Sequence, residues 1–186
     1  MGGDPDFTPL LTERLQLRRS VPDDAPAIAA YRNDPDVGRY QGWDRTDAEG
    51  IRAEIEAMGS RLPGDPGWVQ LTVEERDTGR LVGDVGLAPA DGETGVVKIG
   101  YTIDPAHQGR GYATEAVRAL VRYAFDGLGA HMVRAYANAK NLPSIRVAEK
   151  VGLTLMERFE GTHQGHHWTG VRYELRKEDA GPPPES

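Results

Sequence analysis

Residues 107–116 read His107-Gln108-Gly109-Arg110-Gly111-Tyr112-Ala113-Thr114-Glu115-Ala116. They follow an apolar run at residues 96–103 that is typical of a strand, and they open a helix with strong apolar periodicity. Gly109 and Gly111 lack Cβ atoms, so the backbone can turn sharply here and bring several N–H groups together. The helix adds its own unpaired N–H groups and the positive end of its dipole. This stretch therefore predicts a site for a phosphate or pyrophosphate, with a ligand-free glycine turn as the alternative.

Two other kinds of phosphate loop fit this stretch poorly. A P-loop needs Gly-Lys-Ser/Thr at the helix start, and Arg110-Gly111-Tyr112 offers neither the lysine nor the serine or threonine. A dinucleotide-binding loop needs a third glycine, where this chain has Thr114, and an acid about twenty residues later, after a second strand. The region around Val133 has no such acid. Nucleotide hydrolysis and hydride transfer are therefore disfavoured.

The composition is that of an ordinary globular protein of one domain. The chain has 186 residues, of which 38% are hydrophobic and 27% are charged, enough for one sizeable core. It has no cysteine, which excludes disulfides, thiolate catalysis and cysteine-ligated metals. No apolar run approaches the ~20 residues that cross a bilayer, and the first six residues lack the features of a signal peptide. We therefore expect a cytoplasmic protein with no membrane partner.

The charge is distributed unevenly along the chain. The net charge is −7 at pH 7, which argues against a nucleic-acid partner. Residues 107–150 have a local balance of +4, so the remainder carries −11. A basic segment around the phosphate loop suits a polyanionic cofactor, and an acidic remainder suits a cationic amine substrate. The basic residues of the segment are Arg110, Arg118, Arg122, Arg134, Lys140, Arg146 and Lys150, against the acids Glu115, Asp126 and Glu149.

Periodicity and turn residues predict the order β-α-α-β-β-β-α-β-α-β-β, with the phosphate loop between the fourth strand and the third helix. This order is typical of an α/β protein with a mixed sheet and helices on both faces. One domain should span residues 12–177, between a flexible start at residues 1–11 and a disordered tail at residues 178–186. The expected strands are residues 13–19, 68–74, 80–87, 96–103, 131–137, 153–160 and 168–176, and the expected helices begin near residues 22, 46, 113 and 142.

The chain resembles the GNAT acetyltransferases in two ways. The spacing Gln108-x-x-Gly111-x-Ala113 is similar to the Gln/Arg-x-x-Gly-x-Gly/Ala motif of that family, and the order of elements is similar from about Thr12 to Lys177. The resemblance implies a single GNAT domain whose loop holds the pyrophosphate of acetyl-CoA. The loop residues that it implies are Gln108, Gly109, Arg110, Gly111, Tyr112, Ala113 and Thr114.

Shorter motifs resemble the ribosomal-protein N-terminal acetyltransferases of the RimJ/RimL-like subfamily. That subfamily also contains antibiotic-modifying and metabolic enzymes, so the resemblance indicates the chemistry better than the substrate. The motifs are Thr12-Glu13-Arg14-Leu15-Gln16-Leu17-Arg18, Ile99-Gly100-Tyr101, Gly111-Tyr112-Ala113-Thr114-Glu115-Ala116 and Asn141-x-x-Ser144-x-x-x-x-Glu149-Lys150-x-Gly152-Leu153.

The resemblance also implies roles for polar residues near the expected cleft. Asn141 would contact the pantetheine arm, with Asn138 nearby, because an amide both donates and accepts hydrogen bonds. Ser144 would protonate the leaving thiolate. As alternatives, Asn-Leu-Pro is an ordinary helix start with Asn141 as N-cap, and a serine in a first helical turn is common for structural reasons. Backbone N–H groups near Gly100 and Tyr101 would polarise the thioester carbonyl.

The general base does not follow the family pattern. The family often has a glutamate two residues before the Gly-Tyr pair, and this chain has Lys98, a cation that cannot accept the proton. Attack on a thioester needs a neutral amine, so a carboxylate, or water bound to one, usually takes the proton. We expect Asp84 on the neighbouring strand to serve, with Glu160 as the second candidate. A plain surface acid is the alternative for either residue.

The loop before the last strand contains His163, His166 and His167. Their spacing lacks the HExxH arrangement and no cysteine is near, so we expect no metal site. A histidine that lines the acceptor pocket is the remaining functional interpretation. Further aromatic candidates for that pocket, each of which could equally be a core residue, are Tyr40, Trp43 and Trp68.

The sequence as a whole predicts an acetyl-CoA-dependent N-acetyltransferase that moves an acetyl group directly to a primary amine, either a peptide N-terminus or a small molecule. No covalent enzyme intermediate is expected, because the chain has no cysteine and no Ser/His/Asp order stands out. Three alternatives remain: an aminoglycoside or polyamine acceptor, another acyl-CoA donor, and a non-catalytic CoA-binding regulator. GNAT proteins often pair, so the resemblance also allows a homodimer.

Overall fold

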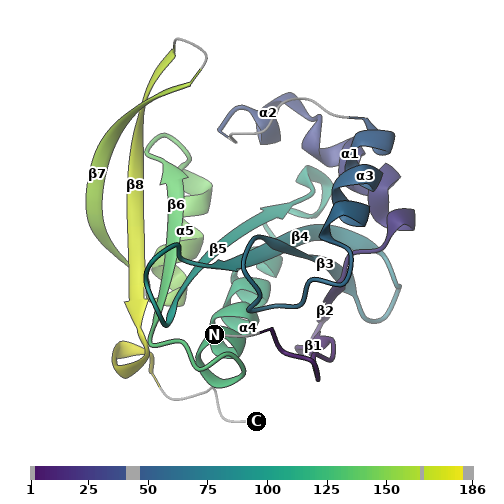
Figure 1. Ribbon diagram of the computed structural model, residues 1–186. Helices are drawn as coiled ribbons and strands as arrows, with labels where there is room; N and C mark the ends of the chain where they lie inside the picture. The colour runs from purple at the N-terminus through teal and green to yellow at the C-terminus, as the bar shows by residue number, and fades with distance from the viewer. Residues whose placement is uncertain (1–2, 41–46, 164–165, 182–186) are drawn as a thin grey trace.

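The computed structural model describes residues 3–40, 47–163 and 166–181, which form one eight-stranded sheet with helices on both faces (Figure 1). The strand order is β1-β2-β3-β4-β5-β6-β8-β7. The strands are β1 (Leu10–Leu11), β2 (Leu15–Arg19), β3 (Val69–Glu75), β4 (Leu81–Pro89), β5 (Val96–Ile103), β6 (Met132–Asn138), β7 (Thr154–His163) and β8 (His166–Arg176). The helices are α1 (Ala25–Arg32), α2 (Pro35–Gly38), α3 (Ala48–Met58), α4 (Tyr112–Asp126) and α5 (Leu142–Val151), with 3-10 turns at Pro22–Asp24, Pro105–His107 and Lys177–Asp179.

The parallel pair β5 and β6 differs from every other neighbouring pair, all of which are antiparallel. Its pairing runs from Val96 with Met132 to Ile99 with Ala135, and goes no further in the described chain. Beyond Ile99, β5 continues beside β4 alone, and β6 continues beside β8 alone. The two strands therefore separate, and the sheet opens at the carboxyl end of β5 (Figure 1).

Helix α4 covers one face of the sheet, and α5 lies beside it (Figure 1). The apolar residues of α4 recur at helical spacing and pack on alternate strand residues such as Leu17, Leu71 and Val85. A fully buried side chain of this size contributes about 1.5–3 kcal/mol to stability, so this layer is the main hydrophobic core. Its α4 residues are Tyr112, Ala116, Val117, Leu120, Val121, Ala124 and Phe125.

The opposite face carries a row of polar residues. Arg18, Thr72, Asp84 and Thr102 are cross-strand neighbours on β2, β3, β4 and β5 in turn. Helices α1 and α3 lie over this side of the sheet and form a smaller core of their own, centred on Ile28 (Figure 1). Buried polar groups need hydrogen-bond partners, so the polar row of the sheet forms hydrogen bonds with residues of α1 and of the turn before it.

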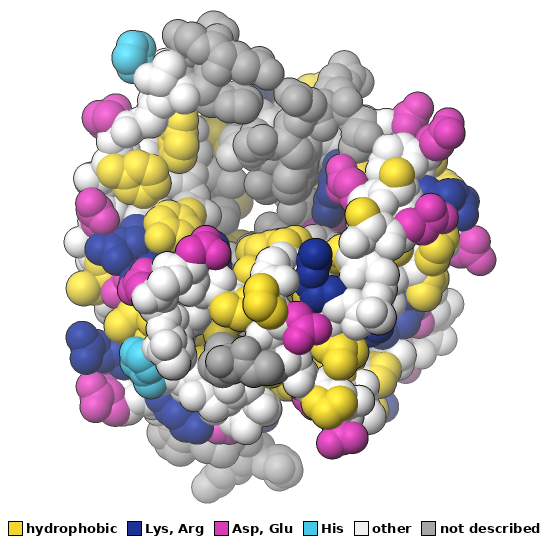
Figure 2. Space-filling model, in the orientation of Figure 1, with side chains coloured by type: hydrophobic (Ala, Val, Ile, Leu, Met, Phe, Trp, Pro, Cys, Tyr) yellow, Lys and Arg dark blue, Asp and Glu magenta, His cyan; other side chains and the backbone are white. Residues whose placement is uncertain are grey.

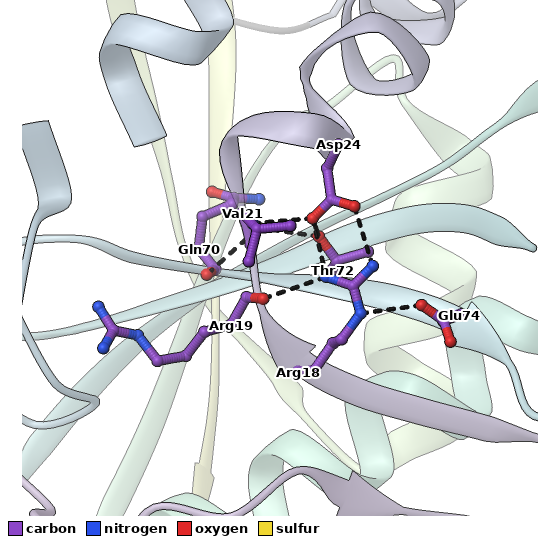
Figure 3. A network of polar contacts seen from close by, with 8 residues as sticks. Arg18, Arg19, Val21, Asp24, Gln70, Thr72 and Glu74 are labelled. Carbon is purple, nitrogen blue, oxygen red and sulfur yellow. Dashed lines mark hydrogen bonds and ion pairs between the residues drawn. The ribbon is translucent and has the colours of Figure 1, made fainter. Parts of the chain in front are cut away.

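Asp24 attaches the start of α1 to the sheet through a largely buried network (Figure 3). Arg18 donates to both carboxylate oxygens of Asp24, at 2.8 and 2.9 Å, and to Glu74 at 2.8 Å. The Thr72 hydroxyl and the Val21 N–H each donate to Asp24 Oδ2 at 2.9 Å. Burial alone would raise the pKa of Asp24, but these hydrogen bonds hold it below its ordinary value.

The order of elements confirms the predicted fold class, with two additions. The first is β1, which lies in the start that the sequence predicts to be flexible; nearby, Phe7 packs edge-on against Tyr123 of α4 with ring centroids 5.5 Å apart. The second is α2, which begins at Pro35 within Asn33-Asp34-Pro35-Asp36, a run of turn-forming residues that by itself predicts only the end of the preceding helix. That stretch also begins a one-turn helix, because the Asp34 side chain accepts from the Asp36 N–H at 2.8 Å.

Two further expectations lie partly outside the described residues. The second helix is expected from Thr46, which is not described, and α3 is observed from Ala48 to Met58. The expected tail begins with a 3-10 turn at Lys177–Asp179, and residues 182–186 are not described. In the described part of the chain, no helix combines the length and the apolar character needed to cross a membrane.

Replacing Asp24 by Asn should lower the free energy of unfolding by about 2–3 kcal/mol, because Arg18 keeps its burial and loses a charged partner. This loss of stability relative to wild type should be largest at neutral pH. It should shrink as the pH falls below the ordinary Asp24 pKa of 3.8 and through the lowered folded value, since the wild-type carboxylate is then protonated as well. Urea titrations across this pH range measure it. The control is Asp23→Asn, a side chain 98% exposed, which should cost well under about 1 kcal/mol; equal losses for both variants would contradict the account.

Candidate active site

The loop between β5 and α4 has the conformation that its glycines predict. Gly109 has φ +76° and Gly111 has φ +84°, and Gly111 is the N-cap of α4. Among the described residues, a Cβ at Gly109 would meet no atom within 4 Å, and one at Gly111 would meet only Arg14 Nη2, at 3.5 Å. The backbone is therefore uncovered where the helix begins, which leaves room for an anion against the first N–H groups of α4.

A cavity of about 530 Å³ lies at this loop, in the opening beyond β5. Four parts of the chain enclose it: residues 36–40, the end of β5, the glycine loop with the first turn of α4, and α5 along most of its length. Among the described residues that line it, the side chains charged at neutral pH are three cations, Arg39, Arg146 and Lys150, and one carboxylate, Asp36. The cavity therefore favours a polyanionic ligand. The loop residues that line it are Gln108, Gly109, Gly111, Tyr112, Ala113 and Thr114.

Tyr101, Asn141 and Ser144 meet at one end of this cavity. The Tyr101 hydroxyl donates to the backbone carbonyl of Ser144 at 2.8 Å, and burial raises the pKa of Tyr101, so the hydroxyl stays protonated. The Asn141 side chain accepts from the Ser144 N–H at 3.3 Å and acts as N-cap of α5. The cap uses the Asn141 oxygen, and Asn141 is also among the residues that line the cavity.

Three of the predicted cofactor residues do not direct their side chains to the cavity in the way the sequence predicts. Gln108 lines the cavity, but its amide turns back and donates to the carbonyl of Ile103 at 2.9 Å, which braces the loop. Arg110 is exposed and is not among the cavity residues. Asn138 also lies outside that set, and its side chain accepts from the Lys140 N–H at 2.9 Å in a local turn.

Asp84, the expected base, is buried under α1 and does not border the cavity. Its carboxylate accepts from the hydroxyl of Tyr31 and the amide of Gln70, and Arg32 Nη2 lies 3.5 Å away. Burial raises the pKa of Asp84, against the opposing effect of Arg32 and Tyr31. Its cross-strand neighbour Thr102 does line the cavity, so Asp84 is one residue away from the site across the sheet.

A glycine pair next to Asp84 holds the indole of Trp68. Gly86 and Gly100 face each other across β4 and β5, and a Cβ on Gly86 would overlap the Trp68 ring. The Trp68 Nε1 donates to Gln70 at 2.8 Å, and Gln70 in turn donates to Asp84. This face of the molecule is hollowed between the β7–β8 hairpin and the α1–α3 side, with apolar side chains along the hairpin (Figure 2).

Of the remaining candidates from the sequence that the structure describes, Tyr40 lines the cavity, and Lys98, Glu160 and His167 do not. Lys98 Nζ lies 3.0 Å from Asp91, and Glu160 is exposed on β7, where it accepts from the Thr169 hydroxyl at 3.1 Å. His167 Nδ1 lies 3.2 Å from the hydroxyl of Thr162. Trp43 and the side chains of His163 and His166 lie outside what the structure describes. In the described residues, no group of three or more His, Cys, Asp or Glu is arranged to hold a metal ion.

The sequence did not predict the part that α2 plays in the site. Asp36, Val37 and Arg39 line the cavity opposite α5. The available signal was Asp34-Pro35, an N-cap residue followed by proline, which is typical of a helix start as well as of a stop. The sequence predicted Arg146 only as one of the basic residues around the phosphate loop, because its charge, and no local motif, marks it.

Comparison with known proteins identifies the family. The model of the acetyltransferase (GNAT) domain matches residues 14–154. The chain belongs to the GNAT acetyltransferase family. It is 34% identical over 140 residues to the uncharacterized N-acetyltransferase p20 of Bacillus licheniformis, a match that covers 74% of this chain and 78% of that protein.

Solved structures of the family have the same fold. A GNAT-family acetyltransferase from Bacillus anthracis has a TM-score of 0.82 and 27% identity, over 92% of this chain and 99% of that one. RimJ of Mycobacterium smegmatis, in complex with CoA-disulfide, has a TM-score of 0.80 and 18% identity, over 96% and 91% of the two chains. The protein is therefore an acyltransferase of this family, built on one domain of mixed α/β structure.

Replacing Asn141 by Ala should lower the free energy of unfolding by about 1 kcal/mol, since the first turn of α5 loses its N-cap. Asn141→Asp should stay within a few tenths of a kcal/mol of wild type, because aspartate caps equally well. Thermal and denaturant unfolding of both variants measure this. A wild-type stability for Asn141→Ala would show that the side chain is not used as a cap.

Proposed function

We propose that the protein is an acetyl-CoA-dependent N-acetyltransferase that moves the acetyl group directly to a primary amine. The observation that carries the proposal is the uncovered backbone at Gly109–Gly111, at the start of α4, inside a cavity whose charges are mostly positive. A diphosphate needs convergent N–H donors and a positive field, and this loop supplies both. The RimJ structure, a relative in fold, was solved with a CoA derivative.

Other residues of the cavity support the binding of the rest of a CoA molecule. The amides and hydroxyls of a pantetheine arm need donors and acceptors, and Asn141 and the free edge of β5 beyond Ile99 offer both. Arg146 and Lys150 line the cavity from α5 and would face the phosphates. When bound, acetyl-CoA supplies an acetyl thioester, which an amine can attack with release of a thiolate.

We assign two functions in the reaction to groups beside the opening, and a third, that of the base, to Asp84. The edge of β5 beyond Ile99 faces the opening, and because successive N–H groups point to opposite edges of a strand, one of the N–H groups of Gly100 and Tyr101 would stabilise negative charge on the carbonyl oxygen there. Ser144 lines the cavity and would donate a proton to the thiolate. A thiol has a pKa near ~8.5, so this proton assists the departure of the sulfur but is not essential.

Asp84 is the proposed base, supported by its burial and by its raised pKa. Because its carboxylate does not border the cavity, a proton from the amine would reach it through an intervening group. Thr102, its neighbour across β4 and β5, lines the cavity and is suited to this. The resulting protonated Asp84 would remain hydrogen-bonded to Tyr31 and Gln70.

The acceptor is proposed to be a cationic amine, either a peptide N-terminus or a small molecule such as a polyamine or an aminoglycoside. The charge of −11 outside residues 107–150 supports a cation, since it raises the local concentration of amines near the protein.

Replacing Asp84 by Asn should reduce kcat/KM by about 100-fold at neutral pH, measured by thiol release with an amine from a panel of acceptors. In the wild type, kcat/KM should fall as the pH drops through the raised pKa of Asp84, because only the carboxylate accepts a proton. The variant should lack this fall. The matched control, Glu160→Gln, should stay within about twofold of wild type; a larger loss there, with an active Asp84→Asn, would move the base to Glu160.

Replacing Gly111 by Val should weaken acetyl-CoA binding by at least about 100-fold, since a branched side chain is strained at φ +84° and fills the space over the loop. Isothermal titration measures the loss. The control is Gly79→Val in the β3–β4 turn, which has φ +66° and open space around it. Both variants should lose similar stability, and only Gly111→Val should lose the cofactor. Wild-type binding by Gly111→Val would refute the site.

A further inference from the structure

Two motifs far apart in the sequence, Thr12–Arg14 and Glu115, meet behind the glycine loop. The Thr12 hydroxyl donates to Glu115 Oε1 at 2.6 Å, and the Arg14 backbone N–H donates to the same oxygen at 2.9 Å. The Arg14 guanidinium donates to Oε2 through Nε at 2.8 Å and lies 2.6 Å from it through Nη2. Four contacts therefore hold one carboxylate. They join the start of β2 to the first turn of α4 (Figure 1).

Arg14 also contacts the loop itself. Its Nη1 donates to the carbonyl of Arg110 at 3.0 Å, and its guanidinium carbon lies 4.7 Å from the centroid of the Tyr112 ring. The Tyr112 hydroxyl donates to Glu75 of β3 at 2.5 Å. A Cβ on Gly111 would lie 3.5 Å from Arg14 Nη2. One side chain thus contacts, or lies against, three successive loop residues from outside the cavity.

Arg14 does not line the cavity on the inner side of the loop. It lines an adjoining groove between residues 9–14 and α4, which shares Gly111, Thr114 and Lys150 with the cavity. Arg14 can therefore act on a ligand of the cavity through the loop and through its charge.

Glu115 carries a negative charge close to the proposed diphosphate site, so its neutralisation by Arg14 affects binding there. Burial would raise the pKa of Glu115, but the hydrogen bonds from Thr12 and Arg14 hold it below its ordinary value, so the group is a carboxylate at neutral pH. It lies in the first turn of α4, where the helix would receive a diphosphate. An unneutralised carboxylate there would repel the ligand and reduce the positive field of the helix end.

We propose that Arg14 is a positioning residue for the diphosphate of the acyl donor: it neutralises Glu115 and fixes Arg110 and Gly111 so that the start of α4 accepts the two phosphates. The proposal rests on the proposed function, because it needs acetyl-CoA as the donor. Arg14 transfers no proton and forms no bond to the substrate. Its effect should therefore be confined to donors that carry the diphosphate.

The experiment compares two acyl donors, acetyl-CoA and S-acetylpantetheine, which has the same thioester and no diphosphate. In Arg14→Ala, KM for acetyl-CoA should rise about tenfold with kcat within about twofold, while the kinetics with S-acetylpantetheine stay at the wild-type level. The ratio of kcat/KM for the two donors should thus fall about tenfold. Arg14→Lys keeps the charge and loses the planar fork, so its ratio should lie between those of the wild type and Arg14→Ala.

A second substitution tests the electrostatic part. Glu115→Gln in the Arg14→Ala background should recover most of the lost acetyl-CoA affinity, because the unpaired carboxylate is gone. Arg158→Ala removes an exposed arginine from β7, at the opposite edge of the sheet, and should leave the ratio unchanged.

Equal losses with both donors, or no change in the ratio for Arg14→Ala, would overturn the proposal. If Arg14→Ala does not fold, the same ratio in Arg14→Lys decides. A wild-type protein that bound no acetyl-CoA at all would instead overturn the proposed function.

Discussion

The separation of β5 from β6 is the constraint on which the rest of the site depends. Parallel strands exchange evenly spaced hydrogen bonds as long as they stay side by side, and here this lasts only from Val96 to Ile99. Past that point the edge of β5 faces an opening, and the chain must leave both strands through a turn and a helix. The starts of α4 and α5 therefore lie beside the same opening, so that two helix N-termini and one free strand edge border a single cavity. In open sheets of this kind, ligands bind at the carboxyl ends of strands for the same reason.

The two faces of the sheet contribute differently to that opening. On the α4 face, an apolar core holds the helix firmly, so the glycine loop before it can adopt positive φ angles without loss of the fold. On the α1 face, carboxylates are buried with their partners: Asp24 with Arg18 and Thr72, and Asp84 with Tyr31, Gln70 and Arg32. A buried carboxylate one residue away from a cavity is costly for stability and useful for proton transfer. This division would put the proposed anion site on one side of β5 and the proposed proton acceptor on the other.

Local features of the sequence were predicted well, and long-range ones were not. The glycine turn, β5 and the start of α5 follow from glycines, apolar periodicity and an N-cap that lie within ten residues of one another, and β5 has the predicted bounds. β1 was missed because two residues show no period, and α2 was missed because Asp34-Pro35 was interpreted only as a stop. The contacts of Asp84 and Glu115 join segments from 14 to 103 residues apart. No local pattern encodes such pairs, so the sequence gives the residue types of the site without their partners.

The central claim is that the glycine loop and its cation-lined cavity form an acetyl-CoA site without rearrangement. Isothermal titration of the purified full chain with acetyl-CoA tests it most directly, at low and at high salt. The account predicts one site per chain with Kd in the range of about 1 μM to 1 mM that is usual for enzyme substrates, weakened at high salt because the phosphates are recognised by charge. The absence of binding at millimolar acetyl-CoA and low salt would contradict it.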